Sequence, residues 1–119
     1  MADQQSRVLL HMARSHRRAV DPNDVFYLEA AGGETLVHMR DRRHLADVRT
    51  LGEVFPFFEQ HGFLRVHRNH AVNWWHIREI RKRDQGTDWE LKLEAPINRV
   101  LPISRSQLEQ VWISFGEVE

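Results

Sequence analysis

Two histidines three residues apart, His67 and His70, lie among arginines in the segment FLRVHRNHAVNWWHIREIRKR, residues 63–83. Residues of these types can serve three chemistries. Paired imidazoles can bind a metal ion, an Asn–His pair can serve a metal-dependent nuclease, and arginine with imidazole and amide donors can bind a polyanion. Because each chemistry needs different supporting residues, the rest of the chain has to distinguish them.

Metal binding and nuclease chemistry lack the residues that they require. A His-x-x-His pair supplies two ligands, whereas a zinc site needs three or four, and no other histidine has a recognised ligand spacing with this pair. A metal-dependent nuclease would use Asn69 with His67 and His70, and it would need a second histidine region and a general base. There is also no nucleophile elbow, no Walker motif and no dinucleotide fingerprint. We therefore expect no metal, no cofactor and no enzymatic activity.

Polyanion binding has suitable donors at two places. Arg68 stands between His67 and Asn69, whose side chains can donate to phosphate oxygens, and arginine suits bidentate recognition of a guanine edge. The second place is SRS, residues 104–106, at the predicted start of a helix. Free backbone N–H groups and two hydroxyls can hold a phosphate there, and Arg105 can project between them. The alternative is that the serines simply cap the helix.

The uneven distribution of charge along the chain is compatible with a nucleic-acid partner, although the net charge is zero. Lys+Arg and Asp+Glu are 17 each, so the net charge is no argument for a nucleic-acid partner. Residues 65–83, however, hold six basic residues against the single acid Glu79, and residues 84–119 are net acidic. The segregation predicts either one strongly positive face or ordinary solvated strand faces.

Length and composition set the class of protein. A chain of 119 residues predicts one domain with a single modest core. It has no cysteine, which fits a reducing compartment, and no apolar stretch long enough to span a bilayer. We expect a soluble cytoplasmic domain with no membrane contact.

Short strands dominate the elements that must position these residues. The glycines of AAGGE fit a tight hairpin between two aromatic and β-branched strands. DWELKLE alternates cleanly between apolar and polar residues. Strands are predicted at RVLLHMA (7–13, followed by a basic turn at RSHR), DVFYLEA (24–30), ETLVHM (34–39), FLRVH (63–67), DWELKLE (88–94) and NRVLPI (98–103). RNH should form a loop between short extended segments, because Arg68 and Asn69 suit a turn.

Two short helices complete the prediction of a mostly β domain. TLGEVFPFFEQHG opens with a capping box of Thr50 and Glu53 and has apolar residues at helical spacing up to Gly62. Pro56 inside it predicts a kink or two short turns. SRSQLEQVWISF forms the second helix, with Leu108, Val111 and Trp112 on one side.

Three segments together resemble a known family. DVFYLEAAGGETLVHM, FLRVHRNHAVN and LPISRSQLEQV, in this order and spacing, are similar to a LytTR-type DNA-binding domain. The most specific parts are F-x-R-x-H-R followed by VN, and the late P-x-S-R. The resemblance covers the chain from about Arg7 to Trp112. It implies an elongated stack of short antiparallel sheets, with a tail at 1–6, the domain at 7–113 and a tail at 114–119.

The resemblance also implies a function and its residues. It implies a bacterial transcription regulator, such as a response-regulator output domain, that binds double-stranded DNA through loops in successive major grooves. Two copies, as a homodimer or as paired monomers, would often bind repeated sites, and a sensor or receiver domain can accompany the domain in a longer chain. The implied base contacts are Arg68, Arg105 and Glu34, and the implied phosphate contacts are His67, Asn69, Thr35, Ser104 and Ser106.

Three features depart from the family pattern. Glu34 is an acid that phosphate would repel, unless it accepts a hydrogen bond from a cytosine amino group. His70 replaces a residue that is commonly apolar, and the pair Trp74–Trp75 is unusual. An exposed tryptophan there would favour a β-rich protein-interaction module, which stays as an alternative beside the HNH-like nuclease.

Overall fold

The computed structural model describes residues 7–84 and 86–117 of the chain. The predicted N-terminal tail, 1–6, and the last two residues of the predicted C-terminal tail, 114–119, lie outside the described residues. In chain order the elements are β1 (Val8–Ala13), β2 (His16–Val20), the 3-10 helix η1 (Pro22–Asp24), β3 (Val25–Ala31), β4 (Glu34–Met39), β5 (His44–Asp47), α1 (Leu51–Glu59), β6 (Phe63–His67), β7 (His70–Asn73), the 3-10 helix η2 (Trp74–His76), β8 (Ile77–Lys82), β9 (Trp89–Leu93), β10 (Val100–Ile103) and α2 (Arg105–Ser114).

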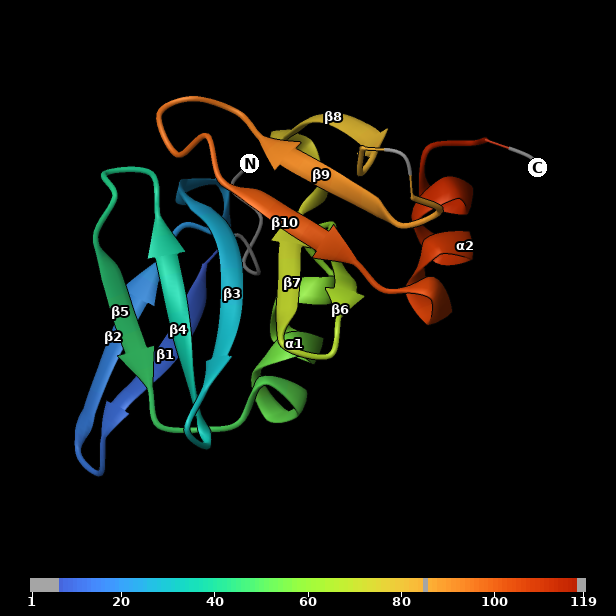
Figure 1. The fold of residues 1–119 in the computed structure, drawn as a ribbon. Helices are drawn as coiled ribbons and strands as arrows, with labels where there is room; N and C mark the ends of the chain where they lie inside the picture. The colour runs from blue at the N-terminus through green and yellow to red at the C-terminus, as the bar shows by residue number, and fades with distance from the viewer. Residues whose placement is uncertain (1–6, 85, 118–119) are drawn as a thin grey trace.

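The strands form three antiparallel sheets (Figure 1). A five-stranded sheet has the order β5-β4-β3-β7-β6, a three-stranded sheet has the order β10-β9-β8, and β1 pairs with β2 alone. The molecule is elongated, with extents of 48 × 38 × 25 Å. The expected fold, a mostly β stack of short sheets with two short helices, is confirmed.

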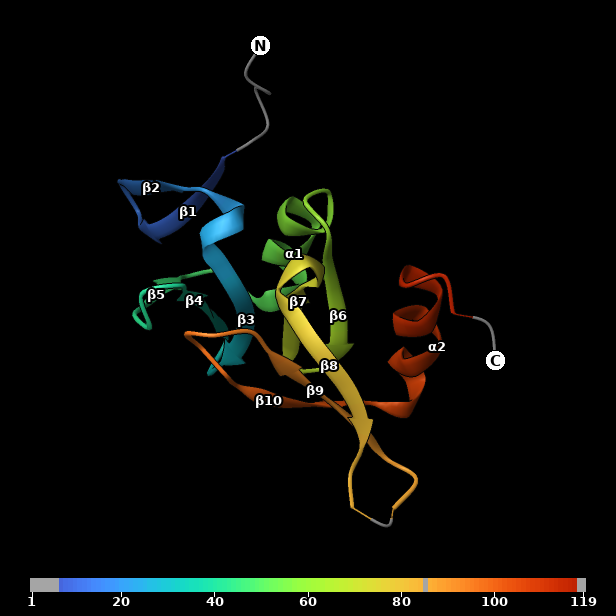
Figure 2. The ribbon, with the colours of Figure 1, turned by 90° about the horizontal axis from the view of Figure 1, so that it is seen from above.

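The five-stranded sheet separates two hydrophobic clusters. On one face it packs against α1 and the β1–β2 hairpin, and on the other against the three-stranded sheet and α2 (Figure 2). The first cluster consists of Val8, Leu10, Val20, Val25, Leu28, Val37, Leu51, Val54, Phe58, Phe63 and Ala71. The second consists of Phe26, Tyr27, Val66, Val72, Leu91, Leu93, Leu101, Ile103 and Val111. The single core expected from length is therefore two cores that share one sheet.

Several predicted local features are present. Gly32 and Gly33 turn the β3–β4 hairpin with φ of +57° and +84°, values that L side chains rarely adopt. Thr50 and Glu53 form the predicted capping box of α1. Pro56 predicted a kink or two short turns, and one helix continues through it from Leu51 to Glu59, so two separate turns do not form. Packing of its buried side chains against the first cluster offsets the one backbone bond that proline removes.

Other elements were not anticipated. The basic turn after β1 is short, and the basic residues continue as strand β2. β5 and the two 3-10 helices were missed as well. Each 3-10 helix begins at a side-chain cap, since Asp21 accepts from the backbone N–H of Asn23 and Asn73 accepts from that of Trp75. No helix of the described residues is long and apolar enough to cross a membrane.

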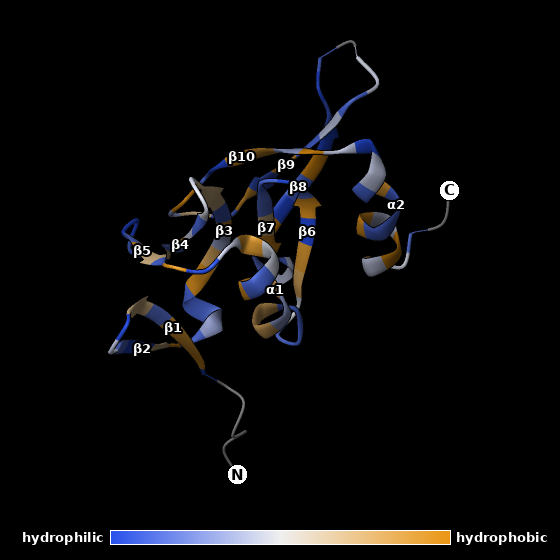
Figure 3. Cartoon of the chain, turned by 90° about the horizontal axis from the view of Figure 1, so that it is seen from below, coloured by the Kyte–Doolittle hydropathy of each residue, from blue (hydrophilic) through white to orange (hydrophobic). Residues whose placement is uncertain are grey.

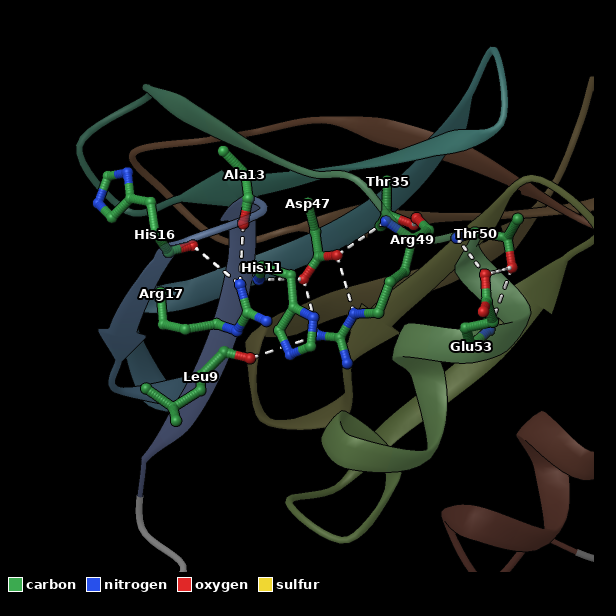
Figure 4. Close-up of polar contacts among 10 residues, drawn as sticks. All are labelled: Leu9, His11, Ala13, His16, Arg17, Thr35, Asp47, Arg49, Thr50 and Glu53. Atoms are coloured by element: carbon green, nitrogen blue, oxygen red, sulfur yellow. Dashed lines mark hydrogen bonds and ion pairs between the residues drawn. The ribbon is translucent and has the colours of Figure 1, made fainter.

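A buried carboxylate fixes the corner between β5 and α1 (Figure 4). Asp47 is fully buried and accepts hydrogen bonds from the backbone N–H of His11 on β1, the backbone N–H of Arg49, and the Arg49 guanidinium at 2.8 and 3.0 Å. Burial alone would raise the pKa of the Asp47 carboxyl, but these bonds to Arg49 and His11 lower it below its ordinary value. The corner therefore joins the β1–β2 hairpin to the five-stranded sheet.

Candidate nucleic-acid interface

The β6–β7 hairpin presents Arg68 and Asn69 at its tip. His67 pairs with His70 across the hairpin, so only these two residues form the turn, and both are exposed. A shift in register between Arg65 and His67 marks a bulge just before the tip. Asn69 does not adopt the left-handed backbone that its residue type tolerates. In the described chain, the non-glycine residues with positive φ are Arg42, Asp84 and Asn98.

Hydrogen bonds hold the backbone of this tip in place. Arg65 donates from Nη2 to the Arg68 carbonyl at 3.0 Å, and the backbone N–H of Ala30 donates to the Asn69 carbonyl at 2.9 Å. The backbone N–H of Asn69 donates to Nδ1 of His67 at 3.2 Å, which leaves Nε2 as the N–H donor of a neutral His67 ring. The turn is thus rigid, while the Arg68 side chain has no ion pair within the described residues.

The joint between β10 and α2 lies beside this hairpin. The backbone N–H of Ser104 donates to the carbonyl of Val66 on β6 at 2.8 Å. Ser104 occupies the N-cap position of α2, but its side chain accepts no capping bond and lies 3.3 Å from the Ser106 hydroxyl. Simple capping by side chains is therefore not how these serines are used. The hydroxyls stand next to the N-terminal backbone N–H groups of the helix, where a helix favours an anion.

Arg105 extends from the start of α2 toward the turn between β8 and β9. Its side chain is 80% exposed, and it donates to Asp88 Oδ1 and to Thr87 Oγ1, each at 3.3 Å. The described part of this turn projects beyond the body of the domain, and its colours run from hydrophilic blue to white (Figures 2 and 3). Sequence reasoning missed this contact, because Asp88 precedes Arg105 by 17 residues.

The β3–β4 tip divides its two predicted contact residues. Glu34 is exposed. Thr35 is fully buried, and its hydroxyl donates to the carbonyl of Arg49 at 2.9 Å. A phosphate contact needs an exposed donor, so the expected role of Thr35 does not fit its position: the side chain holds the β5–α1 corner instead.

These segments lie near one another at one side of the domain (Figure 1). The Ala30–Asn69 bond joins the β3–β4 and β6–β7 hairpins near their tips, and the Ser104–Val66 bond joins α2 to β6. Residues far apart in sequence are thereby brought to adjacent loops, as a loop-based interface requires.

Part of the remaining basic run is paired with acids of its own sheet. Arg81 on β8 contacts Glu90 at 2.8 Å and Glu79 at 2.7 Å, and Arg83 lies 3.5 Å from Glu90. The hydrogen bond to Glu90 raises the pKa of Arg81 above its ordinary value. The positive charge counted in residues 65–83 is therefore not one free cationic face.

Asn73, in the VN part of the motif, supports the site from within the core. Its buried amide donates to the carbonyls of Pro22 and Val25 at 3.2 and 3.1 Å, and its oxygen accepts from the N–H of Trp75. The amide thus joins the end of β7 to the start of β3.

The two tryptophans after Asn73 differ in exposure. Trp75 is 66% exposed, and Trp74 is half-buried against Phe115. In residues 7–84 and 86–117, no group of three or more acidic or histidine side chains is placed to hold a metal ion.

Fold and loops define a small β domain that places arginines and short hydrogen-bond donors on adjacent turns, a class suited to nucleic-acid recognition. The sequence matches the family of the LytTr DNA-binding domain over residues 15–113, and the chain belongs to that family. This is a family of DNA-binding regulator domains and not of enzymes. The family description identifies residues 15–113 as a DNA-binding domain.

Two known proteins are similar to this chain. The CO-responsive transcriptional regulator RcoM of Rhodospirillum rubrum is 33% identical over 92 residues, which are 77% of this chain and 38% of that regulator. The chain thus spans well under half of that relative's length. A solved structure, the LytTr DNA-binding domain of a Bacillus cereus protein described as a methyl-accepting/DNA response regulator, has a TM-score of 0.73 and 25% identity, and the match covers 93% of this chain and 97% of that one.

Proposed function

We propose that this domain recognises a specific sequence of double-stranded DNA by inserting the β6–β7 tip and the β10–α2 joint into the major groove. The observation that carries the proposal is Arg68, an exposed arginine without an acidic partner among residues 7–84 and 86–117, on a turn whose backbone is held by three hydrogen bonds. Holding the turn before binding lowers the entropy that DNA recognition would cost.

Each residue has a role in this proposal. Arg68 and Arg105 read base edges, since a guanidinium can donate two parallel bonds to guanine. Glu34, exposed at the β3–β4 tip, would accept from a cytosine amino group. The residues proposed to bind phosphate are His67, Asn69, Ser104 and Ser106. Thr35 is left out because its hydroxyl is buried and already donates.

The assembly around the domain is also a proposal. Residues 7–113 would act as the DNA-binding unit, as a homodimer or as paired monomers on repeated sites in the bacterial cytoplasm. Because the chain covers only 38% of RcoM, a sensor or receiver domain can be expected in the full regulators that contain such a domain.

Selection of bound sequences from a random duplex pool tests the proposal. The pool is incubated with the protein at near-physiological salt and with a chelator present, and the retained duplexes are sequenced. Enrichment of a defined motif supports specific, metal-free recognition. Binding without enrichment would reject it, and cleavage that the chelator stops would favour a metal-dependent nuclease.

A second candidate, a protein-interaction module, has one supporting observation. Trp75 is 66% exposed next to Trp74 and Phe115, and an exposed aromatic group of this kind is typical of interfaces. The salt dependence of binding separates the two candidates. Affinity for DNA falls steeply as salt rises, whereas an apolar protein contact changes little.

A further inference from the structure

A row of titratable side chains crosses the five-stranded sheet on the face of the second cluster. Strand register places His44 beside His38, Tyr27 beside His38, Glu29 beside His70, and His70 beside His67. All five strands contribute to this row, which we call the histidine row: His44, His38, Glu29, His70 and His67. The row ends at the β6–β7 tip.

Glu29 occupies the centre of the row and lies between two histidines. Its Oε1 is 2.8 Å from Nε2 of His38, and its Oε2 is 3.7 Å from Nε2 of His70. His38 also stacks on Tyr27, with ring centroids 4.0 Å apart. His70 is different, since both of its ring nitrogens are buried without a hydrogen-bond partner. The 3.7 Å separation is too long for a hydrogen bond, so one of the two contacts of Glu29 is incomplete.

The row is adjacent to the candidate DNA interface. The residue after Glu29, Ala30, donates its backbone N–H to the carbonyl of Asn69 at the β6–β7 tip, and His70 follows Asn69 directly. The rings of His67 and His70 have centroids 5.8 Å apart, and Glu29 Oε2 lies 3.7 Å from His70 Nε2. Both distances are shorter than the screening length of about 8 Å at physiological salt. A phosphate bound by His67 or Asn69 would therefore sense the charge of Glu29 and His70.

Other charged groups face the row from the loops around it. Arg42 and Arg99 line a cavity of about 170 Å³ together with Tyr27 and His38. Burial lowers the pKa of His38 and of His70 below the ordinary value. Glu29 raises the pKa of both histidines in part, whereas Arg99 lowers both further. His44 also lowers the pKa of His38, and His67 also lowers that of His70. Both imidazoles are therefore neutral at pH 7, and the carboxylate beside the DNA interface is not balanced by them.

We propose that Glu29 is a positioning residue for the β6–β7 tip, and that proton uptake by the neighbouring His70 draws the two side chains together and strengthens DNA binding. The proposal rests on the proposed function. A protonated His70 can donate to Glu29 where the neutral ring now lies 3.7 Å away. Uptake of the proton also cancels a negative charge close to the phosphates.

Measurement of affinity against pH tests this inference. Fluorescence anisotropy gives the dissociation constant of the full chain for its selected duplex between pH 7.5 and 5.5, at constant ionic strength. If DNA binding is coupled to one proton, we expect binding to tighten by about threefold to tenfold as the pH falls below 6.5. A flat profile on a specifically bound duplex would overturn the inference and leave the proposed function intact. Absence of specific binding at every pH would instead reject the proposed function.

Two variants and a control assign the effect to this pair. His70→Gln and Glu29→Gln should each remove most of the gain at low pH, and Glu29→Gln should bind somewhat more tightly than the wild type at pH 7.5, because it lacks the carboxylate. His61→Gln, before the opposite end of β6, should keep the full gain. Thermal unfolding shows whether each variant is folded.

Two results would contradict the inference. One is an equal loss of affinity at every pH for both folded variants, which is what a merely structural role predicts. The other is the same loss of the pH response in His61→Gln, which would mean that general charging of histidines is the cause.

Discussion

The β5–α1 corner and the β6–β7 tip use arginine in opposite ways. At the corner, Arg49 is only 17% exposed and makes two bonds to the buried carboxylate of Asp47. At the tip, Arg68 is exposed, has no acidic partner in the described residues, and stands on a backbone that other groups hold. An arginine whose charge is satisfied internally stabilises the fold, whereas we propose that the arginine on the hydrogen-bonded turn binds DNA.

Arg105 lies between these extremes. Its side chain is 80% exposed, which suits a residue that binds DNA, yet it contacts Asp88 and Thr87 on the β8–β9 turn. The contact has to be exchanged before Arg105 can reach a base. Variants at the three places therefore separate effects on folding from effects on DNA binding.

The largest effect on stability is expected at the corner. Asp47→Asn removes the charge that Arg49 neutralises and should lower the free energy of unfolding by about 3 kcal/mol, since breaking a buried pair leaves an uncompensated charge. Urea unfolding measures it. Asp41→Asn, which breaks the exposed pair with Arg43, is the control and should change stability little. Equal stability of the two variants would mean that the corner is not what holds these elements.

The next effect is on DNA and not on folding. Arg68→Ala should weaken binding to the selected duplex by about 1–3 kcal/mol, because one bidentate base contact is lost. Its urea unfolding curve should match that of the wild type. Binding to random duplex should also persist, since that binding comes from phosphates. A variant that binds both duplexes with wild-type affinity would show that Arg68 reads no base.

Variants of the Arg105–Asp88 pair should change DNA affinity in opposite directions. Arg105→Ala should weaken specific binding at a different base step by about 1–3 kcal/mol. Asp88→Asn should tighten it by about twofold to fivefold, the size expected for release of an exposed ion pair. In a double-mutant cycle, Asp88→Asn should give no gain once Arg105 is alanine. If Asp88→Asn still tightens DNA binding in the Arg105→Ala variant, Asp88 affects DNA directly and not through Arg105.

The smallest expected effect is on the stability of the DNA-free protein at mild acidity. Burial lowers the pKa of His38 and His70 in the folded state, so the unfolded chain binds more protons below pH 6.5. Stability is then complete above the ordinary histidine value and falls as the pH drops below it. Urea unfolding at pH 7.5 and 5.5 measures the decrease, which should be smaller in His70→Gln. A decrease of unchanged size in that variant would exclude His70 as a source.

Local signals in the sequence predicted part of this fold. The glycines of the β3–β4 hairpin, the Thr50–Glu53 capping box and the loop at Arg68 each depend on residues close together in the sequence. The loop predicted over RNH is shorter in the structure, since His70 begins β7. β5 could not be predicted in this way, because a four-residue strand with two charged or titratable residues is stabilised by pairing with β4. The continuity of α1 through Pro56 could not be predicted for a related reason: the packing that retains the helix comes from other elements.

The sequence predicted which residues belong to the candidate site better than it predicted their burial and their contacts. The sequence indicated Arg68, Arg105 and the serines, but it could not show that Thr35 is buried or that Asp88 contacts Arg105. It also could not show that Arg81 on β8 contacts the acids Glu79 and Glu90 of the same sheet. These facts depend on register between strands, which a count of charges does not contain.

The position of β3 in two cores has a consequence for the dynamics of the molecule. Residues of this strand pack to both sides of the sheet, with Val25 and Leu28 in one cluster and Phe26 and Tyr27 in the other. Neither cluster can open without exposing apolar side chains that belong to β3. Amide hydrogens in the middle of this strand should therefore exchange with solvent only when the whole domain unfolds, and more slowly than those of the β1–β2 hairpin.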